Sequence, residues 1–166
     1  MINARGDISK MLKFEFSYQT PIGRLWIAEE NGKIVKISTQ GNITENYTES
    51  YLIKKAFRQL SEYFQKKRRN FDLPIKTEGT EFQKRVWQEL VKIPYGETRS
   101  YGEIACRIGL PGAARAVGGA NNKNKILIVV PCHRVIGADG SLVGFAAGIK
   151  IKKYLLELES EKSGNN

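Results

Sequence analysis

The stretch Ile126-Leu127-Ile128-Val129-Val130-Pro131-Cys132-His133-Arg134-Val135 places a cysteine beside the single histidine of the chain. The five apolar residues that come first predict a buried strand over 126–130. A free thiol has a pKa of about 8.5, and a neighbouring imidazole can activate it as a nucleophile. Because cysteine is also a common core residue, an inert buried thiol is the alternative interpretation.

Strand geometry limits how this pair can work. Successive side chains of a strand point to opposite faces, so Cys132 and His133 could not meet if the strand continued through them. Activation therefore requires that the chain leaves the extended conformation at Pro131, where the ring restricts the backbone, or that a water molecule bridges the two side chains.

Composition describes a globular chain of 166 residues, with 41% apolar and 27% charged residues, which is one large domain or two small ones. No apolar run approaches membrane-spanning length, and Met1–Lys13 lacks the apolar centre of a signal peptide. We expect no membrane partner and a cytoplasmic location, or a nuclear one in a eukaryote. Cys106 and Cys132 are too few for a disulfide framework, and with one histidine they predict neither a metal site nor a cofactor.

The formal charge of +10 is concentrated around the cysteine. Between Thr98 and Leu156 the chain has nine basic and two acidic residues. Such a balance favours a polyanionic partner, and nucleic acid is the best candidate. A basic face that only meets solvent is the alternative.

The first part of the chain, 1–75, is predicted to be a small α+β domain. Phe14, Phe16 and Tyr18 alternate with polar residues as in a strand, and Asn31-Gly32 between the runs 25–28 and 33–37 signals a hairpin. From Tyr51 the apolar period becomes helical and continues to the basic run 66–69. One face of this helix is expected to consist of Leu52, Ala56, Leu60 and Phe64, with Phe57 and Tyr63 beside them.

A linker at 76–79 leads to a second domain, predicted over 80–160, and 161–166 is expected to be a disordered tail. Thr80 and Gln83 form a capping-box pattern at its first helix. Helices over 100–108 and 113–122, joined by the turn 109–112, have helix-turn-helix spacing. A second hairpin is expected around 138–141, between 135–137 and 142–144. A last amphipathic helix is marked by Ile151, Tyr154, Leu155 and Leu158.

The helix over 113–122 is unusual because glycine and alanine dominate it, and Arg115 is its only long side chain. Small side chains allow a backbone to approach a ligand closely. Such a helix suits a DNA groove, with one arginine inserted into the base stack. Close packing of the helix inside the core is the alternative.

These residues resemble the O6-alkylguanine-DNA alkyltransferase family. The motif Pro131-Cys132-His133-Arg134-Val135 is similar to its active-site signature. Further motifs at the family's spacing are Phe82-Gln83-(x)3-Trp87, Ile93-Pro94-Tyr95-Gly96-Glu97-Thr98, Ser100-Tyr101, Ala114-Arg115-Ala116-Val117-Gly118-Gly119-Ala120 and Asn124. The resemblance is strong over about 77–160 and loose over 11–75.

The resemblance implies an RNase H-like sheet-and-helix domain, then a mainly helical, winged helix-turn-helix domain that binds the minor groove of double-stranded DNA. A monomer would flip O6-alkylguanine, or O4-alkylthymine, out of the duplex and transfer its alkyl group irreversibly to Cys132. The implied catalytic residues are Cys132, His133, acting through a water, Glu159, which holds the imidazole, Asn124, which braces the turn, and Tyr101, which donates a proton. The implied DNA-binding residues are Arg115, Ala114, Ala116, Gly118, Ser100, Tyr101 and Asn122, and the base pocket is formed by Val135, Phe145, Ala146 and Ala147.

Two departures from the family concern the pocket and the last helix. Ala146-Ala147 stands where many relatives have a serine- and glycine-rich loop, and Tyr154 replaces the usual tryptophan. The N-terminal part also lacks the cysteine and histidine set that binds zinc in some relatives. The alternative interpretation of Glu159 is a solvated charge at a helix end without a role in catalysis.

Three other functions compete with alkyl transfer. A non-transferring lesion-binding protein of the alkyltransferase-like kind replaces the acceptor cysteine, which this chain keeps as Cys132. A winged-helix transcription regulator needs base-reading side chains on its second helix, and 113–120 offers almost none. A cysteine hydrolase needs an oxyanion loop, of which the sequence gives no sign.

Overall fold

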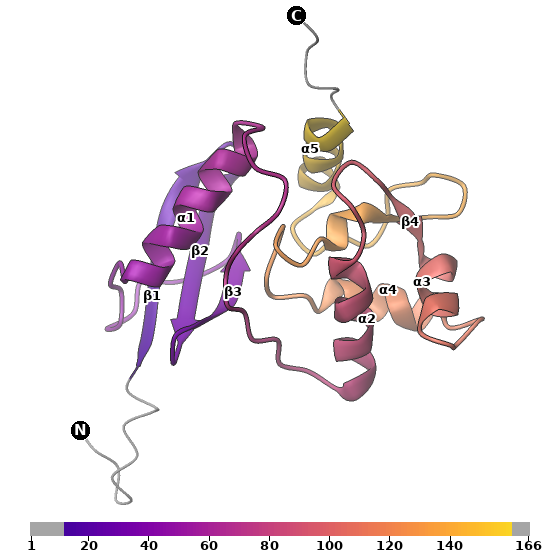
Figure 1. Cartoon of the computed structure of the whole chain (residues 1–166), viewed down its shortest axis with the longest axis horizontal. Coiled ribbons are helices and arrows are strands. Elements are labelled where there is room, and N and C mark those ends of the chain that lie inside the picture. Colours follow the sequence, from indigo (N-terminus) through magenta and orange to yellow (C-terminus); the bar gives the residue numbers. More distant parts are fainter. Residues whose placement is uncertain (1–11, 161–166) are drawn as a thin grey trace, which may run out of the picture. The chain divides into compact units, whose positions relative to one another are not determined.

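A computed structural model describes residues 12–160 of the chain, which divides into two compact units, Met1–Thr77 and Glu78–Asn166. The first is a sheet with one helix and the second is mainly helical, so the predicted α+β class is confirmed (Figure 1). No described helix is both long and apolar enough to cross a membrane.

The sheet of the N-terminal unit is antiparallel and has the strand order β1-β2-β3. The strands are β1 (Lys13–Thr20), β2 (Gly23–Glu30) and β3 (Lys33–Ser38). Asn31 and Gly32 connect β2 to β3 with φ of 50° and 77°, a left-handed conformation that asparagine and glycine tolerate best. The predicted hairpin is therefore confirmed.

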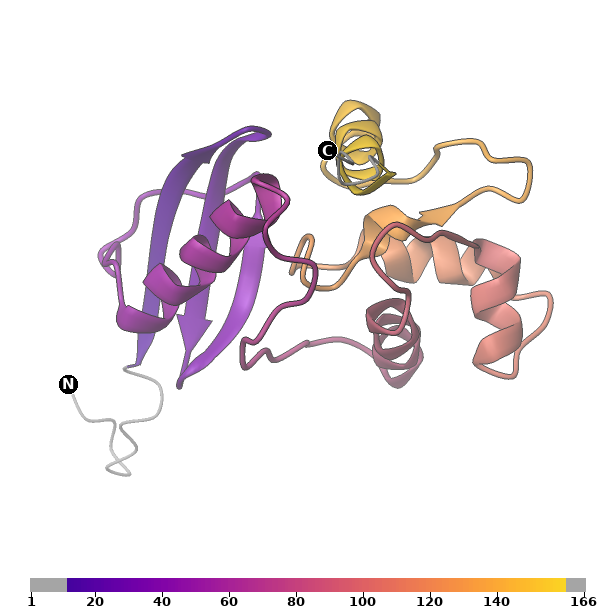
Figure 2. The ribbon, with the colours of Figure 1, turned by 45° about the horizontal axis from the view of Figure 1, so that its top comes forward.

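Helix α1 (Tyr51–Phe64) lies across one face of this sheet (Figures 1 and 2). Ser50 caps it by accepting a hydrogen bond from the backbone N–H of Ile53. Of the expected apolar face, Ala56, Leu60 and Tyr63 are buried, whereas Leu52, Phe57 and Phe64 are only half-buried. The fully buried residues of the helix are Ile53, Ala56, Leu60 and Tyr63, which share a core with Leu25, Ile27, Ile34 and Ile37.

The C-terminal unit begins with three helices that pack on one another (Figure 2). They are α2 (Glu81–Val91), α3 (Tyr101–Arg107) and α4 (Ala114–Asn122). The capping box of Thr80 and Gln83 is present at α2. The pair α3 and α4 occupies the predicted helix-turn-helix segments within one or two residues.

The predicted strand over 126–130 was wrong, because residues 127–129 form a turn, Val130 lies in a bend and Ile126 forms only an isolated β-bridge. Ile128 has a φ of 71°, which is rare for a β-branched residue and incompatible with a strand. The segment leads into a 3₁₀ helix, η2 (Cys132–Arg134). Pro131 leaves the extended conformation with ψ at 63°, which is the first of the two alternatives given for the Cys-His pair.

The second predicted hairpin was also wrong. Strand β5 (Val135–Ile136) pairs in parallel with β4 (Arg99–Ser100), and the expected partner 142–144 forms no strand. Only the turn remains, closed by a 2.9 Å hydrogen bond from the Gly137 N–H to the Ser141 carbonyl. The long-range pairing with β4 takes the backbone groups that a hairpin would have used.

Helix α5 (Ile149–Ser160) ends the described part of the chain. Its buried residues are Lys152, Leu155, Leu158 and Glu159. Ile151 and Tyr154, expected on the buried face, are only half-buried. The helix therefore directs one lysine and one glutamate toward the interior, where each needs a partner.

Candidate active site

The turn that presents Cys132 is organised by the side chain of Asn124. Its Oδ1 accepts a hydrogen bond from the Ile126 N–H at 2.9 Å, and its Nδ2 donates to the carbonyl oxygens of Val130 at 2.8 Å and Ile126 at 3.3 Å. One buried amide thus replaces the strand ladder as partner of this backbone. It also holds Ile128 in its unfavourable conformation, which costs about 1–3 kcal/mol.

The thiol of Cys132 is buried, with 2% of the residue exposed. Nδ2 of Asn124 lies 3.1 Å from Sγ, and Nδ2 of Asn121 donates to the Cys132 carbonyl at 3.1 Å. Burial raises the pKa of the thiol to about 11, although the Asn124 hydrogen bond and the charge of Lys152 act in the opposite direction. The resting thiol is therefore protonated at neutral pH and needs a base.

His133 is fully buried and oriented by Glu159. Its Nε2 lies 2.7 Å from Oε1 of that carboxylate. An ionised carboxylate only accepts, so Nε2 carries the proton. Burial lowers the pKa of His133, although Glu159 opposes this shift, and in the neutral ring Nδ1 has a lone pair. Nδ1 has no hydrogen-bond partner within residues 12–160.

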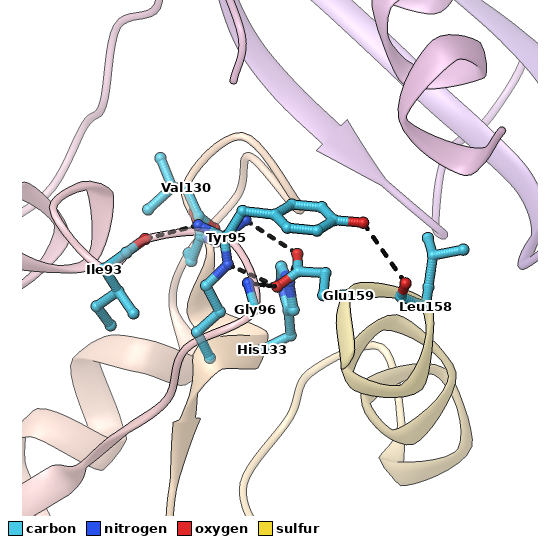
Figure 3. Close-up of polar contacts among 9 residues, drawn as sticks. Ile93, Tyr95, Gly96, Val130, His133, Leu158 and Glu159 are labelled. Atoms are coloured by element: carbon cyan, nitrogen blue, oxygen red, sulfur yellow. Dashed lines mark hydrogen bonds and ion pairs between the residues drawn. The ribbon is translucent and has the colours of Figure 1, made fainter. Parts of the chain in front are cut away.

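Arg134 completes the arrangement around Glu159. Its Nε and one terminal nitrogen each lie 2.9 Å from a carboxylate oxygen, and its other terminal nitrogen donates to the Ile93 carbonyl at 2.7 Å. The Gly96 N–H lies 3.3 Å from the same carboxylate (Figure 3). Burial alone would raise the pKa of Glu159, but hydrogen bonds from His133 and Arg134 lower it to about 2. The glutamate is therefore an anion at neutral pH.

A second set of hydrogen bonds links Lys152 to Tyr101. Lys152 Nζ donates to the carbonyl oxygens of Val135 at 2.6 Å and Val143 at 3.0 Å, and it lies 3.4 Å from the Tyr101 hydroxyl. That hydroxyl donates to the Val143 carbonyl at 2.7 Å. Burial raises the pKa of Tyr101 and lowers that of Lys152, while the charges of Lys152 and Cys132 interact.

Helix α4 presents a smooth outer face. Arg115 is exposed near its start, and the other exposed residues are Ala116, Gly119 and Asn122. Val117 and Ala120 are buried, so one face of the helix packs on the core and the opposite face is exposed to solvent. Of the other candidate DNA-binding residues, Ala114 and Gly118 are half-buried, and Ser100 caps α3 by accepting from the Glu103 N–H.

Of the candidate base-pocket residues, Val135 and Phe145 contact Lys152. Val135 is fully buried, and Phe145 lies with its ring centre 6.0 Å from Lys152 Nζ. Ala146 is exposed and Ala147 half-buried on the loop before α5. In 12–160, no three histidine, cysteine or acidic side chains are grouped so as to hold a metal ion.

Sequence reasoning missed Arg134 as the partner of Glu159, Lys152 as the donor beside Tyr101, and Asn121 as a donor to Cys132. A signal existed for Lys152, because it lies three residues before Leu155 and seven before Glu159, on one face of α5. Arg134 gave no local signal, since its partners Ile93 and Glu159 are 41 and 25 residues away.

Comparison with known families assigns both parts of the chain. Residues 14–77 match the ribonuclease-like domain of 6-O-methylguanine DNA methyltransferase, and residues 81–161 match its DNA-binding domain. The chain belongs to the 6-O-methylguanine DNA methyltransferase family. It is 50% identical over 151 residues to the methylated-DNA–protein-cysteine methyltransferase of Methanosarcina acetivorans, with 86% of this chain and 95% of that protein covered.

Other members of the family agree. The methylated-DNA–protein-cysteine methyltransferase of Mycobacterium leprae is 46% identical over 151 residues, with 88% of this chain and 92% of that protein covered. The crystal structure of Mycobacterium tuberculosis O6-methylguanine methyltransferase matches with a TM-score of 0.84 at 43% identity, covering 93% of this chain and 96% of that one. The Mycobacterium tuberculosis OGT structure in complex with DNA matches with a TM-score of 0.83 at 47% identity, covering 89% and 92%.

Proposed function

We propose that Cys132 accepts the alkyl group from O6-alkylguanine in double-stranded DNA, once per molecule. Because the chain belongs to this family, it is a methyltransferase that repairs DNA by alkyl transfer. The alternative, a lesion-binding protein without transfer activity, is not favoured. The observation that carries the assignment is the buried Cys132 beside a histidine whose Nδ1 is the basic nitrogen. A soft sulfur nucleophile suits displacement at an alkyl carbon.

The proton of Cys132 leaves through His133 in this proposal. Within the described residues no hydrogen bond joins Sγ directly to the imidazole, and Nδ1 is buried without a partner. A water molecule between them would carry the proton from sulfur to Nδ1. Glu159 keeps the proton on Nε2 and stabilises the imidazolium that results. Asn124, whose Nδ2 lies 3.1 Å from Sγ, stabilises the developing thiolate.

The leaving guanine requires a proton as the bond between O6 and the alkyl carbon breaks. Tyr101 is the proposed donor, because burial keeps its hydroxyl neutral. Lys152, 3.4 Å from that hydroxyl, is placed to return a proton to it. The pocket for the base is proposed to consist of Val135, Phe145 and the loop at 146–147. Sulfur and alkyl carbon are then joined by a thioether that is not reversed.

DNA contact is proposed to occur in the minor groove through α4. Its exposed face is made of small residues, which lets the helix backbone approach the groove closely. Arg115 would enter the base stack and replace the flipped nucleotide, which offsets part of the unstacking cost of a few kcal/mol. Ala114, Ala116, Gly118, Ser100, Tyr101 and Asn122 would line this contact. The protein is proposed to act as a monomer.

The intact mass of the protein after incubation with duplex DNA containing O6-methylguanine tests this proposal. One methyl group is expected on each molecule, with Cys132 as the modified residue in a peptide digest. Cys132→Ser should gain no mass, and Cys106→Ser, which replaces the exposed cysteine, should react normally. Repeated turnover, or an adduct on another residue, would refute the proposal.

A further inference from the structure

A groove runs along α1 in the N-terminal unit, apart from every residue assigned to alkyl transfer. A cavity of about 510 Å³ lies beside the helix, and a second of about 180 Å³ adjoins it, because Phe57 and Ser61 line both. The larger cavity is lined by three aromatic residues and three cations, namely Tyr18, Tyr51, Phe57, Lys54, Lys55 and Arg58. The two cavities together suit an extended ligand more than a compact one.

The aromatic rings of the groove offer flat surfaces. Tyr18 and Phe57 stack with their ring centres 3.8 Å apart and their planes within 2°. Tyr51 is 84% exposed, and its ring stacks on no other aromatic ring within residues 12–160. An exposed tyrosine beside a stacked pair provides a platform on which nucleobases can stack without regard to sequence.

The cations of the groove favour a polyanion. Lys54 and Arg58 are one helical turn apart, both are exposed, and neither forms an ion pair within residues 12–160. Lys55 has only a 3.8 Å contact with Asp72, whose side chain is 92% exposed. Glu49 also lines the groove, but it accepts a 2.7 Å hydrogen bond from Tyr18. The segment 51–69 has seven basic residues and one acidic residue.

We propose that this groove binds a single strand of nucleic acid. The bases stack on Tyr51 and on the Tyr18–Phe57 pair, and the phosphates lie against Lys54 and Arg58. Cations along a groove with aromatic rings on its wall are the combination by which proteins hold single strands. All of the groove residues belong to the sheet-and-helix unit, and none of them is assigned a role in alkyl transfer.

Binding of a fluorescent oligothymidylate of about twelve nucleotides to the full chain tests the proposal. Lys54→Glu/Arg58→Glu should weaken binding at least tenfold. The slope of log affinity against log salt should become shallower by about 1.4, because two phosphate contacts are lost. Arg24→Glu/Lys33→Glu is the matched control, since it makes the same charge change at exposed positions of β2 and β3 outside the groove. This control should bind within about twofold of the unchanged chain.

The stacking contribution has its own pair of variants. Tyr51→Ala should weaken binding by about fivefold or more, and Tyr51→Phe should retain it, because the ring and not the hydroxyl is used. Polyglutamate of similar length should compete poorly. If polyglutamate displaces the oligonucleotide as well as an unlabelled oligonucleotide does, and if its binding is unchanged in Tyr51→Ala, the surface binds acidic peptides and the proposal is overturned.

Photocrosslinking locates the strand. A bromodeoxyuridine oligonucleotide should crosslink to peptides that contain Tyr18, Tyr51 or Phe57. The proposal would be refuted by crosslinks confined to residues 78–160. It would also be refuted if Lys54→Glu/Arg58→Glu and the control double variant lost the same amount of oligonucleotide affinity. Alkyl transfer from free O6-methylguanine base to Cys132, measured in the same variants, should not change. If the unchanged chain fails to transfer the alkyl group, the proposed function is wrong, but the proposal for the groove is unaffected.

Discussion

Nε2 of His133 lies 2.7 Å from Oε1 of Glu159, although 26 residues separate them in the chain. Both side chains are buried, and the same carboxylate pairs with Arg134. This contact fixes which imidazole nitrogen carries the proton and leaves Nδ1 as the basic one. The glutamate at the end of α5 therefore sets the protonation state beside Cys132, which rules out its interpretation as a solvated charge at a helix end.

Replacement of this carboxylate tests the contact. In Glu159→Gln the imidazole loses the anion that stabilises its protonated form, so the rate of methyl transfer from duplex DNA should fall by about 10²-fold. Buried Arg134 also loses its partner, which should lower the free energy of unfolding by about 3 kcal/mol. Glu157→Gln is the control, because that side chain is exposed on the same helix. Equal rates for the two variants would contradict the role of Glu159.

The same pair predicts a loss of stability in acid. The pKa of Glu159 is lowered from 4.5 to about 2, so its contribution is present above pH 4.5 and is lost as the pH falls toward 2. The contribution is about 3 kcal/mol. The lowered pKa of His133 has the same sign, because the unfolded chain takes up its proton below about pH 6.5. Urea unfolding between pH 7 and 3, compared with Glu159→Gln, should show a shallower pH dependence in the variant.

Asn124 is expected to support both the fold and the chemistry. Asn124→Ala leaves the buried backbone groups of Ile126 and Val130 without partners, so the free energy of unfolding should fall by about 2 kcal/mol. Alkyl transfer to Cys132 should slow as well, since the thiolate loses a donor. Asn122→Ala removes an exposed amide two residues away and should change stability by less than about 0.5 kcal/mol. A similar loss in both variants would show that the turn does not depend on Asn124.

Arg115 is expected to increase the rate of alkyl transfer from duplex DNA but not from the free base. Arg115→Ala should slow alkyl transfer from a duplex about tenfold or more, because nothing replaces the flipped base in the stack. Transfer from free O6-methylguanine base should stay unchanged. Lys123→Ala, which removes another exposed cation just after α4, should reduce duplex affinity in a salt-dependent way without that selective loss of rate. Equal losses on duplex and free base would exclude an inserted side chain.

Lys152 is predicted to lower the pKa of the thiol. In Lys152→Met the positive charge near Cys132 disappears, and the carbonyl oxygens of Val135 and Val143 lose their donor. In a Cys106→Ser background, the thiolate absorbance near 240 nm that remains after subtraction of the matching Cys132→Ser protein should then titrate at higher pH than in the unchanged chain. Lys150→Met, at an exposed position on the same helix, should leave the titration where it was. An unshifted midpoint in Lys152→Met would show that the charge does not reach the sulfur.

Local sequence determined the elements whose stabilising groups lie within a few residues. The Asn31-Gly32 hairpin, the Thr80 capping box and the two helices of the helix-turn-helix need partners no more than about four residues away, so their patterns were sufficient. The motif at Cys132 likewise identified the family, because it is a run of adjacent residues.

The tertiary structure alone decided how the site is assembled. The run 126–130 is as apolar as a strand, yet the Asn124 amide takes its backbone hydrogen bonds and folds it into turns. Val135 pairs with Arg99 rather than with its neighbours, and Lys152 meets Tyr101 across 51 residues. A buried charge must find a partner wherever the fold brings one, and no local pattern encodes that choice. Cys132 is therefore identified by its own sequence, whereas the hydrogen bonds around it come from residues spread from α3 to α5.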